Sequence, residues 1–255
     1  MLEKGMMTTK ATTTIDYIVQ PIADECVNTL YQISTSSALV EGVYSGSVSS
    51  SVLLKHGDFG LGTFENLEGE MVILDGQIYQ VAERVRHRSD DFLVPFAAIT
   101  LFRAAASFAI DNAATLKDLE LACDQQRISE NLFYALRFDG IFETIHARAV
   151  HAVPQNTRLL DAAKTQSEFH LENIEGTLVG FWSPRYSSSF SIPGYHLHFI
   201  SKDRTKGGHL LDCSARKLKA RVHVLSEYNI QLPDSGLFLT TNLSKDPSSE
   251  LAKTE

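Results

Sequence analysis

Short runs of alternating hydrophobic and polar residues cover most of this chain and predict many β-strands with a few short helices. Apolar runs at residues 71–74 and 77–81 flank Asp75-Gly76. Asp-Gly accepts the positive φ angles that a tight turn requires, so this segment predicts a β-hairpin. Residues 132–136 lead through Asp139-Gly140 into another alternating segment, which predicts a second hairpin.

One helix is predicted between these hairpins, at about residues 116–126. Thr115 and Asp118 have the spacing of a capping box, which marks the start of a helix. The side chains that would share one apolar face of this helix are Leu116, Leu119 and Cys123.

After Pro154 a second block begins, with a short helix expected at about residues 159–165 and strands over most of the remainder. The polar tail from Ser244 onward has the composition of a disordered end. The strand patterns of this block fall at residues 176–182, 194–200, 209–213 and 220–225.

Two histidines on one of these strands point to a metal site. Side chains alternate along a strand, so His196 and His198 project from the same face. Residues 202–208 are polar and end in paired glycines, which predicts a turn that returns His209 beside them. A lone His-x-His pair is more often an exposed polar face, but three neutral imidazoles with open positions suit a catalytic metal.

Composition and charge exclude some function classes. The 255 residues carry a formal net charge of −8, which argues against nucleic acid or an anionic membrane surface as a partner. No apolar run approaches the roughly 18 residues of a membrane-spanning helix, and residues 1–14 lack the apolar core of a secretory signal. Cys26, Cys123 and Cys213 are odd in number and widely spaced, which favours reduced thiols in the cytoplasm.

A series of collinear motifs links the chain to a known enzyme family. The motifs are DFGLGT (58–63), LEGEM (67–71), AR (147–148), QSEF (166–169), GTLVGF (176–181), PGYHLHF (193–199) and GGH (207–209). From about Asn28 to Leu243, the chain resembles the α-acetolactate decarboxylase family on these motifs.

The resemblance implies an α/β (α+β) fold with two domains. The first is a mixed-sheet domain at residues 15–153, and the second is a β-barrel-like domain at residues 154–255 that carries the histidine site. The resemblance also implies a homodimer and a C-terminal tail that folds over the cleft between the domains.

The site implied by the resemblance contains zinc (Zn2+) and three further polar residues. His196, His198 and His209 would hold the metal, while Glu70, Arg148 and a glutamate near the C-terminus would be catalytic. By the family's spacing this last residue is Glu255, and Glu250 is the alternative.

The implied reaction converts 2-acetolactate (2-hydroxy-2-methyl-3-oxobutanoate) to acetoin and CO2, within acetoin and butanediol metabolism. The hydroxyl and ketone oxygens of this substrate can chelate one metal, which acts as an electron sink when CO2 leaves. No organic cofactor is then needed. Arg148 offers a planar charged fork for a carboxylate, and Glu70 or the tail glutamate can deliver the proton.

Two other function classes remain open from the residues alone. A cupin-like metal-dependent oxygenase or isomerase also uses His-x-His and a later histidine, but it expects a glutamate where this chain has Ser201-Lys202-Asp203. A non-enzymatic metal-binding module would leave Arg148 and Glu70 remote from the metal.

The other six histidines lack a partner at ligand spacing and are expected to be structural or exposed, although His146 could line the cleft. They are His56, His87, His146, His151, His170 and His223.

Overall fold

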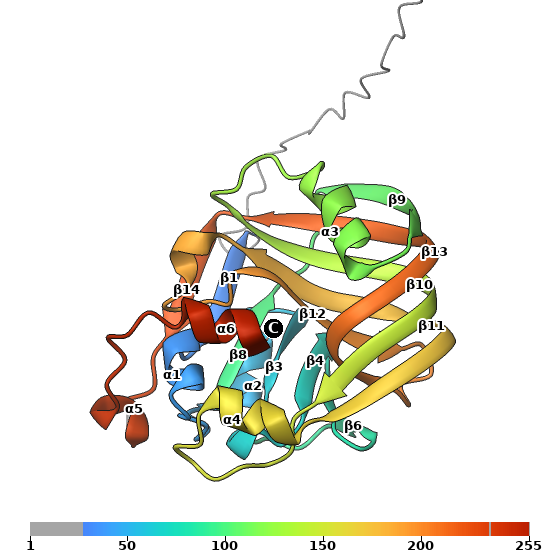
Figure 1. Cartoon of the computed structure of the whole chain (residues 1–255). Coiled ribbons are helices and arrows are strands. Elements are labelled where there is room, and N and C mark those ends of the chain that lie inside the picture. Colours follow the sequence, from blue (N-terminus) through green and yellow to red (C-terminus); the bar gives the residue numbers. More distant parts are fainter. Residues whose placement is uncertain (1–27, 235, 255) are drawn as a thin grey trace, which may run out of the picture.

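Two large β-sheets lie against each other in the computed structural model, which describes residues 28–234 and 236–254 (Figure 1). The first is a seven-stranded mixed sheet in the order β14-β1-β8-β3-β4-β5-β6, in which β1 and β14 are parallel. Its strands are β1 (Thr29–Ile33), β3 (Phe59–Thr63), β4 (Glu70–Leu74), β5 (Gln77–Val81), β6 (Val85–Arg88), β8 (Phe96–Thr100) and β14 (Glu227–Gln231).

The second sheet has five antiparallel strands in the order β10-β11-β12-β13-β9. An additional pairing of β10 with β13 bends the sheet round on itself, which gives it a barrel-like form. Its strands are β9 (Ala106–Ala113), β10 (Phe133–Ala149), β11 (Ser167–Ser183), β12 (Gly194–Ser201) and β13 (Gly207–Leu225).

Short helices and a two-stranded ribbon connect these strands. The elements are α1 (Ser36–Val40), β2 (Val48–Ser49), α2 (Ser50–Leu53), η1 (Leu54–His56), η2 (Glu65–Leu67), β7 (Leu93–Val94), α3 (Leu116–Asp124), α4 (Leu159–Ala162), η3 (Ala163–Thr165), η4 (Arg185–Ser187), α5 (Leu237–Thr240) and α6 (Ser248–Thr254). The α/β fold class expected from the sequence is confirmed. Within the described ranges, no helix is both long and apolar enough to span a membrane.

Several local predictions are confirmed. β4 and β5 form the first hairpin, and Asp75 and Gly76 at its turn both have positive φ angles, 52° and 75°. α3 begins with the predicted capping box between Thr115 and Asp118. Cys123 and Cys213 are buried free thiols in the apolar core of the second sheet, whereas Cys26 lies outside the described residues.

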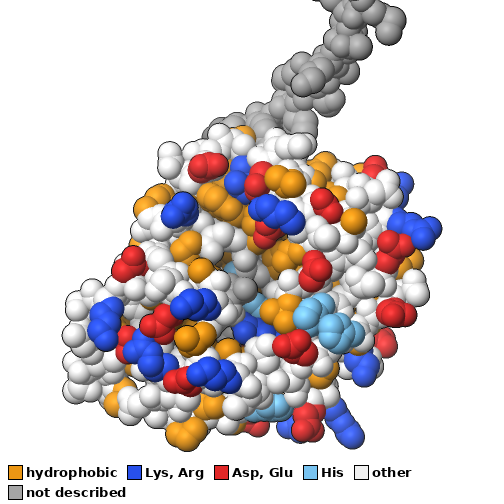
Figure 2. Space-filling view, in the orientation of Figure 1, with side chains coloured by type: hydrophobic (Ala, Val, Ile, Leu, Met, Phe, Trp, Pro, Cys, Tyr) orange, Lys and Arg blue, Asp and Glu red, His pale blue; other side chains and the backbone are white. Residues whose placement is uncertain are grey.

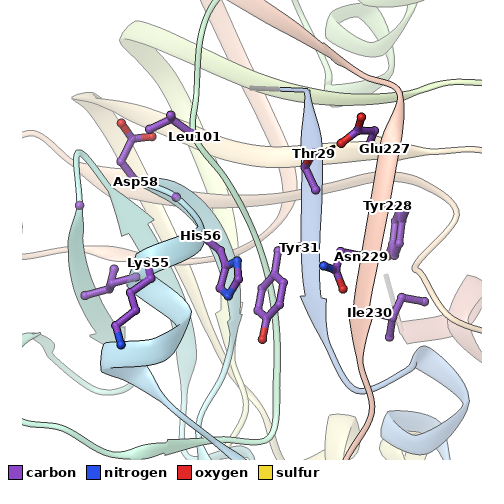
Figure 3. Close-up of a pocket in the computed structure, with 13 residues that line it drawn as sticks. Thr29, Tyr31, Lys55, His56, Asp58, Leu101, Glu227, Tyr228, Asn229 and Ile230 are labelled. Carbon is purple, nitrogen blue, oxygen red and sulfur yellow. Dashed lines mark hydrogen bonds between the residues drawn. The ribbon is translucent and has the colours of Figure 1, made fainter. Parts of the chain in front are cut away.

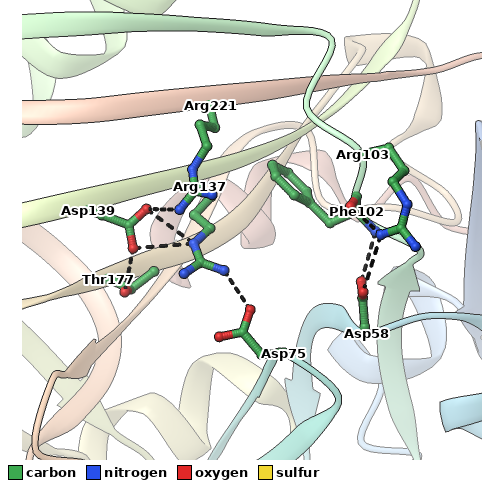
Figure 4. A network of polar contacts seen from close by, with 8 residues as sticks. All are labelled: Asp58, Asp75, Phe102, Arg103, Arg137, Asp139, Thr177 and Arg221. Atoms are coloured by element: carbon green, nitrogen blue, oxygen red, sulfur yellow. Dashed lines mark hydrogen bonds and ion pairs between the residues drawn. The ribbon is translucent and has the colours of Figure 1, made fainter.

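The second predicted hairpin is wrong, because β10 runs without a turn from Phe133 to Ala149. The Asp139 carboxylate is held in the middle of the sheet, where it accepts hydrogen bonds from Arg137, Arg221 and Thr177 (Figure 4). Gly140 allows the neighbouring strand to approach, since a Cβ there would lie 2.8 Å from the carbonyl oxygen of Lys217. Side chains from distant strands therefore stabilise an extended Asp-Gly in place of a turn.

An apolar layer fills the space between the two sheets. Leu61 and Val72 of the first sheet pack with Val179 and Phe181 of β11, and Phe59 meets Phe181 edge to face at 6.3 Å. At the rim of this layer, the β4–β5 turn is joined to β10 by an ion pair of 2.7 Å between Asp75 and Arg137 (Figure 4). These contacts fix β4 against the second sheet.

The strands of the second sheet lie on both sides of the expected domain division at residues 153 and 154. β9 and β10 precede the division, β11, β12 and β13 follow it, and β14 returns to the first sheet. The division of the chain into two domains stays a prediction.

The C-terminal segment folds back as α6 instead of extending away from the molecule (Figure 1). Leu251 is only 2% exposed and packs in an apolar cluster with Leu39 of α1 and Leu159 of α4. Burial of a leucine contributes about 1.5–3 kcal/mol, which helps to hold this segment against the molecule. The disordered end that composition suggests is therefore wrong for residues 248–254.

Candidate metal centre and its polar surroundings

Three histidines meet on the second sheet as the sequence predicts. β12 and β13 form the expected hairpin, in which His198 and His209 are directly paired. The ring centroids of His196, His198 and His209 are 5.1 to 5.3 Å apart. Their ligand nitrogens lie within 4.8 Å of one another, so one ion can be shared by all three.

Gly208 makes this arrangement possible. Its φ angle is 151°, and a Cβ at this position would lie 2.6 Å from the carbonyl oxygen of Arg148. Only glycine lets β13 come so close to β10. The pairing sets Arg148 opposite His209 and so brings an arginine to the histidine cluster.

His198 has the tautomer of a metal ligand. Its Nδ1 lies 2.8 Å from the carbonyl oxygen of Met71, so Nδ1 must carry the donated proton and Nε2 keeps its lone pair. That Nε2 is buried and has no hydrogen-bond partner among the described residues. A buried polar atom without a partner costs free energy, and a bound cation would satisfy it.

Burial keeps all three imidazoles neutral. It lowers the pKa of His198 to about 4, although the Met71 hydrogen bond opposes the shift. Burial also lowers the pKa of His196 and His209 well below the usual range, and nearby positive charge, including that of Arg148, acts in the same direction. Neutral imidazoles with free lone pairs are the form that binds a metal.

Glu70 comes to the cluster from the other sheet, at the start of β4. Its side chain is buried, and Oε2 lies 3.7 Å from His198 Nε2, while Oε1 accepts a 3.4 Å hydrogen bond from the Val150 N–H. Burial raises the pKa of Glu70 to about 7, against the opposing effects of Arg148 and the Val150 N–H. A carboxyl group with such a pKa can exchange a proton near neutral pH.

Arg148 is also buried, with 7% of its surface exposed. Nη1 donates a 2.9 Å hydrogen bond to Gln166 Oε1, and Nη2 donates to the main-chain carbonyl of Thr254 at the end of α6. Nε has no hydrogen-bond partner in the described part of the chain. The guanidinium is thus held in place on one edge and keeps a donor for an incoming anion.

The two candidate tail glutamates are in different situations. The Glu250 carboxylate forms an ion pair with Arg158, and Arg158 also pairs with Glu41 at 2.8 Å. Through Arg158, Glu250 connects α6 to the end of α1. Glu255 lies outside the described residues. It directly follows Thr254, whose carbonyl is bound to Arg148.

One small cavity is lined by five of the six predicted site residues: Glu70, Arg148, His196, His198 and His209. A hollow with basic and histidine side chains is visible in the molecular surface (Figure 2). The sequence did not identify Gln166 as a partner of Arg148, nor the other residues that line the cavity. These are Leu39, Gly62, Thr63, Leu67, Phe96, Val150, Leu159 and Ile192.

A larger cavity of about 760 Å3 lies elsewhere, at the edge of the first sheet (Figure 3). Tyr31 and His56 stack at its wall with ring centroids 3.6 Å apart, and Lys55 and Asn229 also line it. No member of the histidine cluster lines this cavity. Cavity volume alone would therefore indicate this cavity as the functional site, whereas metal-ligand chemistry indicates the smaller cavity lined by the histidine cluster.

Comparison with known proteins links most of the chain to one family. Residues 30–245 match the family model of alpha-acetolactate decarboxylase. The chain is 42% identical over 244 residues to the alpha-acetolactate decarboxylase of Methanosarcina mazei, covering 94% of this chain and 85% of the relative. It is 35% identical over 242 residues to that of Bacillus subtilis strain 168, covering 91% and 92%.

Solved structures give the same result. The crystal structure of acetolactate decarboxylase from Bacillus subtilis subspecies spizizenii superposes with a TM-score of 0.85 at 34% identity. The match covers 89% of this chain and 100% of that chain.

Proposed function

Because the chain belongs to the alpha-acetolactate decarboxylase family, we propose that it decarboxylates 2-acetolactate to acetoin and CO2. The observation that carries the proposal is the meeting of Arg148 and Glu70 with three histidines at one cavity. A metal-binding module has no need of these two residues beside its ligands. Family membership favours the decarboxylase over the cupin-like oxygenase.

We propose Zn2+ as the metal. Three neutral imidazoles leave at least one coordination position open, as catalytic zinc requires, and His198 Nε2 is a buried ligand atom that lacks another partner among the described residues. Glu70, 3.7 Å from that atom, is within reach of the same ion. A bound zinc would act as a Lewis acid toward the hydroxyl and ketone oxygens of the substrate.

Arg148 binds and orients the substrate carboxylate in this proposal. Its hydrogen bonds to Gln166 and Thr254 fix the plane of the guanidinium before substrate arrives. Pre-organised positioning of this kind lowers the barrier without reorganisation during the reaction. The apolar side chains of the cavity exclude water and accept the substrate methyl groups.

Proton delivery requires an acid beside the carbon that loses CO2. Glu70 is buried at the site, and burial raises its pKa to about 7 in the metal-free protein, so we propose it as one group that can exchange this proton. We propose Glu255 as a second proton donor, since it directly follows Thr254, whose main-chain carbonyl accepts a hydrogen bond from Arg148. Glu250 is less suited because it is engaged by Arg158.

The decisive experiment measures CO2 release from 2-acetolactate by the purified full chain, before and after removal of metal with a chelator. We expect activity that disappears on chelation and returns when Zn2+ is added. Activity that survives complete metal removal would refute the zinc proposal, and absence of activity in the zinc-loaded protein would refute the function. The homodimer, the cytoplasmic location and the place in acetoin metabolism stay predictions.

A further inference from the structure

A second group of metal-ligand side chains lies on the adjacent strands β10 and β11. It consists of His146, Glu168 and His170, whose ligand atoms all lie within 4.8 Å of one another. His146 and His170 are directly opposite each other in the strand pairing, and Glu168 precedes His170 by two residues. Side chains two residues apart on a strand share a face, so the pairing brings all three together.

The three side chains of this group are already in contact with one another. His146 Nε2 lies 2.8 Å from Glu168 Oε2, and the rings of His146 and His170 stack with centroids 4.2 Å apart. Gln166 Nε2 donates a 2.9 Å hydrogen bond to the other carboxylate oxygen of Glu168, which orients the carboxylate. Such outer hydrogen bonds are typical of carboxylates that bind metals.

The group is accessible, unlike the buried cluster. The side chains of His146 and Glu168 are 31% and 46% exposed, so an ion can enter and keep bound water. Exposed histidines lie beside acidic side chains on the face shown in Figure 2. Both rings can turn toward a common ion at little cost because they are not enclosed by the core.

We propose that His146, Glu168 and His170 form a second binding site for a divalent transition metal such as Zn2+. Two imidazoles and one carboxylate are a donor set that zinc accepts, and water can complete the coordination. The site is weaker than the buried cluster because it is open to solvent and must displace the His146–Glu168 hydrogen bond. It does not depend on the proposed decarboxylase function.

Hydrogen bonds through Gln166 connect this second site to Arg148. Arg148 Nη1 donates to Gln166 Oε1, and Gln166 Nε2 donates to Glu168. A metal bound at Glu168 Oε2 would leave Oε1 free to keep its bond to Gln166. The second site can therefore fill without disturbing the arginine.

The test is equilibrium dialysis of the full chain against micromolar Zn2+, with bound metal measured by atomic emission. Wild type should bind about two Zn2+ per chain, and His170→Ala about one. Glu168→Gln should weaken the second binding event at least about tenfold. The matched control is His151→Ala, which removes an exposed histidine hydrogen-bonded to Ser167 and should leave two zinc ions bound.

Mutations must also affect zinc binding at the two sites independently. His198→Ala should lose the zinc that resists dialysis into metal-free buffer and keep the exchangeable one. A His198→Ala variant that binds no exchangeable zinc, or a His170→Ala variant that still binds two zinc ions, would overturn the proposal. Loss of one zinc in His151→Ala would likewise overturn it, because binding would then not depend on the three named ligands.

Discussion

Arg148 donates a hydrogen bond from Nη2 to the main-chain carbonyl of Thr254, 106 residues further along the chain. This bond joins a buried strand residue to the last turn of α6, whose Leu251 packs with Leu39 and Leu159 of the cavity lining. Arg148 therefore contacts both the histidine cavity and the C-terminal helix.

Replacement of Arg148 by lysine keeps the positive charge but removes the planar fork. We expect kcat/KM for acetolactate to fall about 100-fold, since a misplaced carboxylate reacts slowly. The protein should stay folded, but its melting temperature should fall because lysine cannot make both hydrogen bonds to Gln166 and Thr254. Steady-state kinetics and thermal unfolding check this. Unaltered kinetics would show that Arg148 has only a structural role.

Removal of any one cluster histidine should abolish binding of the proposed zinc ion. His196→Ala, His198→Ala and His209→Ala are each expected to reduce zinc retained after dialysis from about one per chain to near zero, with activity lost in parallel. His87→Ala is a suitable control, because His87 is exposed and bonds to Gln77. Retention of both zinc and activity in His209→Ala would contradict the shared-ion geometry.

Glu70 should make the metal-free protein less stable as pH rises. Its folded pKa is about 7 against an ordinary 4.5, so between these values the folded state binds a proton that the unfolded state has lost. The free energy of unfolding should therefore fall with pH in this window, by up to about 1.4 kcal/mol per pH unit. The buried histidines have the opposite effect.

Urea unfolding of metal-free wild type and Glu70→Gln at pH 5, 6, 7 and 8 isolates this contribution, because both proteins contain the same histidines. The free energy of unfolding of the wild type should fall relative to that of Glu70→Gln as pH rises. The control Glu68→Gln, at an exposed position, should show the same pH dependence as the wild type. A constant difference between wild type and Glu70→Gln across this range would show that the folded pKa is not raised.

The tail should contain a proton donor. Glu255→Gln is expected to lower kcat about 100-fold and to retain zinc, because loss of a general acid slows the chemistry more than it weakens metal binding. Glu250→Gln breaks only the partly exposed pair with Arg158, so it should change kcat less than about fivefold. If both variants keep normal turnover, the tail is not catalytic and Glu70 acts alone.

Local signals in the sequence determined the elements whose causes are also local. The Asp75-Gly76 turn, the capped start of α3 and the His196–His209 hairpin all depend on neighbouring residues, and all are present. The same Asp-Gly signal failed at residues 139 and 140. There, Arg221 on a distant strand contributes to holding the aspartate in an extended strand.

The tertiary structure alone decided what surrounds the histidines. Glu70 reaches them because two sheets pack face to face, and Arg148 reaches Thr254 because α6 buries Leu251. The pairing of His146 with His170 is equally invisible in the sequence, since it depends on the register of two long strands. Periodicity specifies which face of a strand a residue occupies, but strand register and sheet packing decide which faces meet.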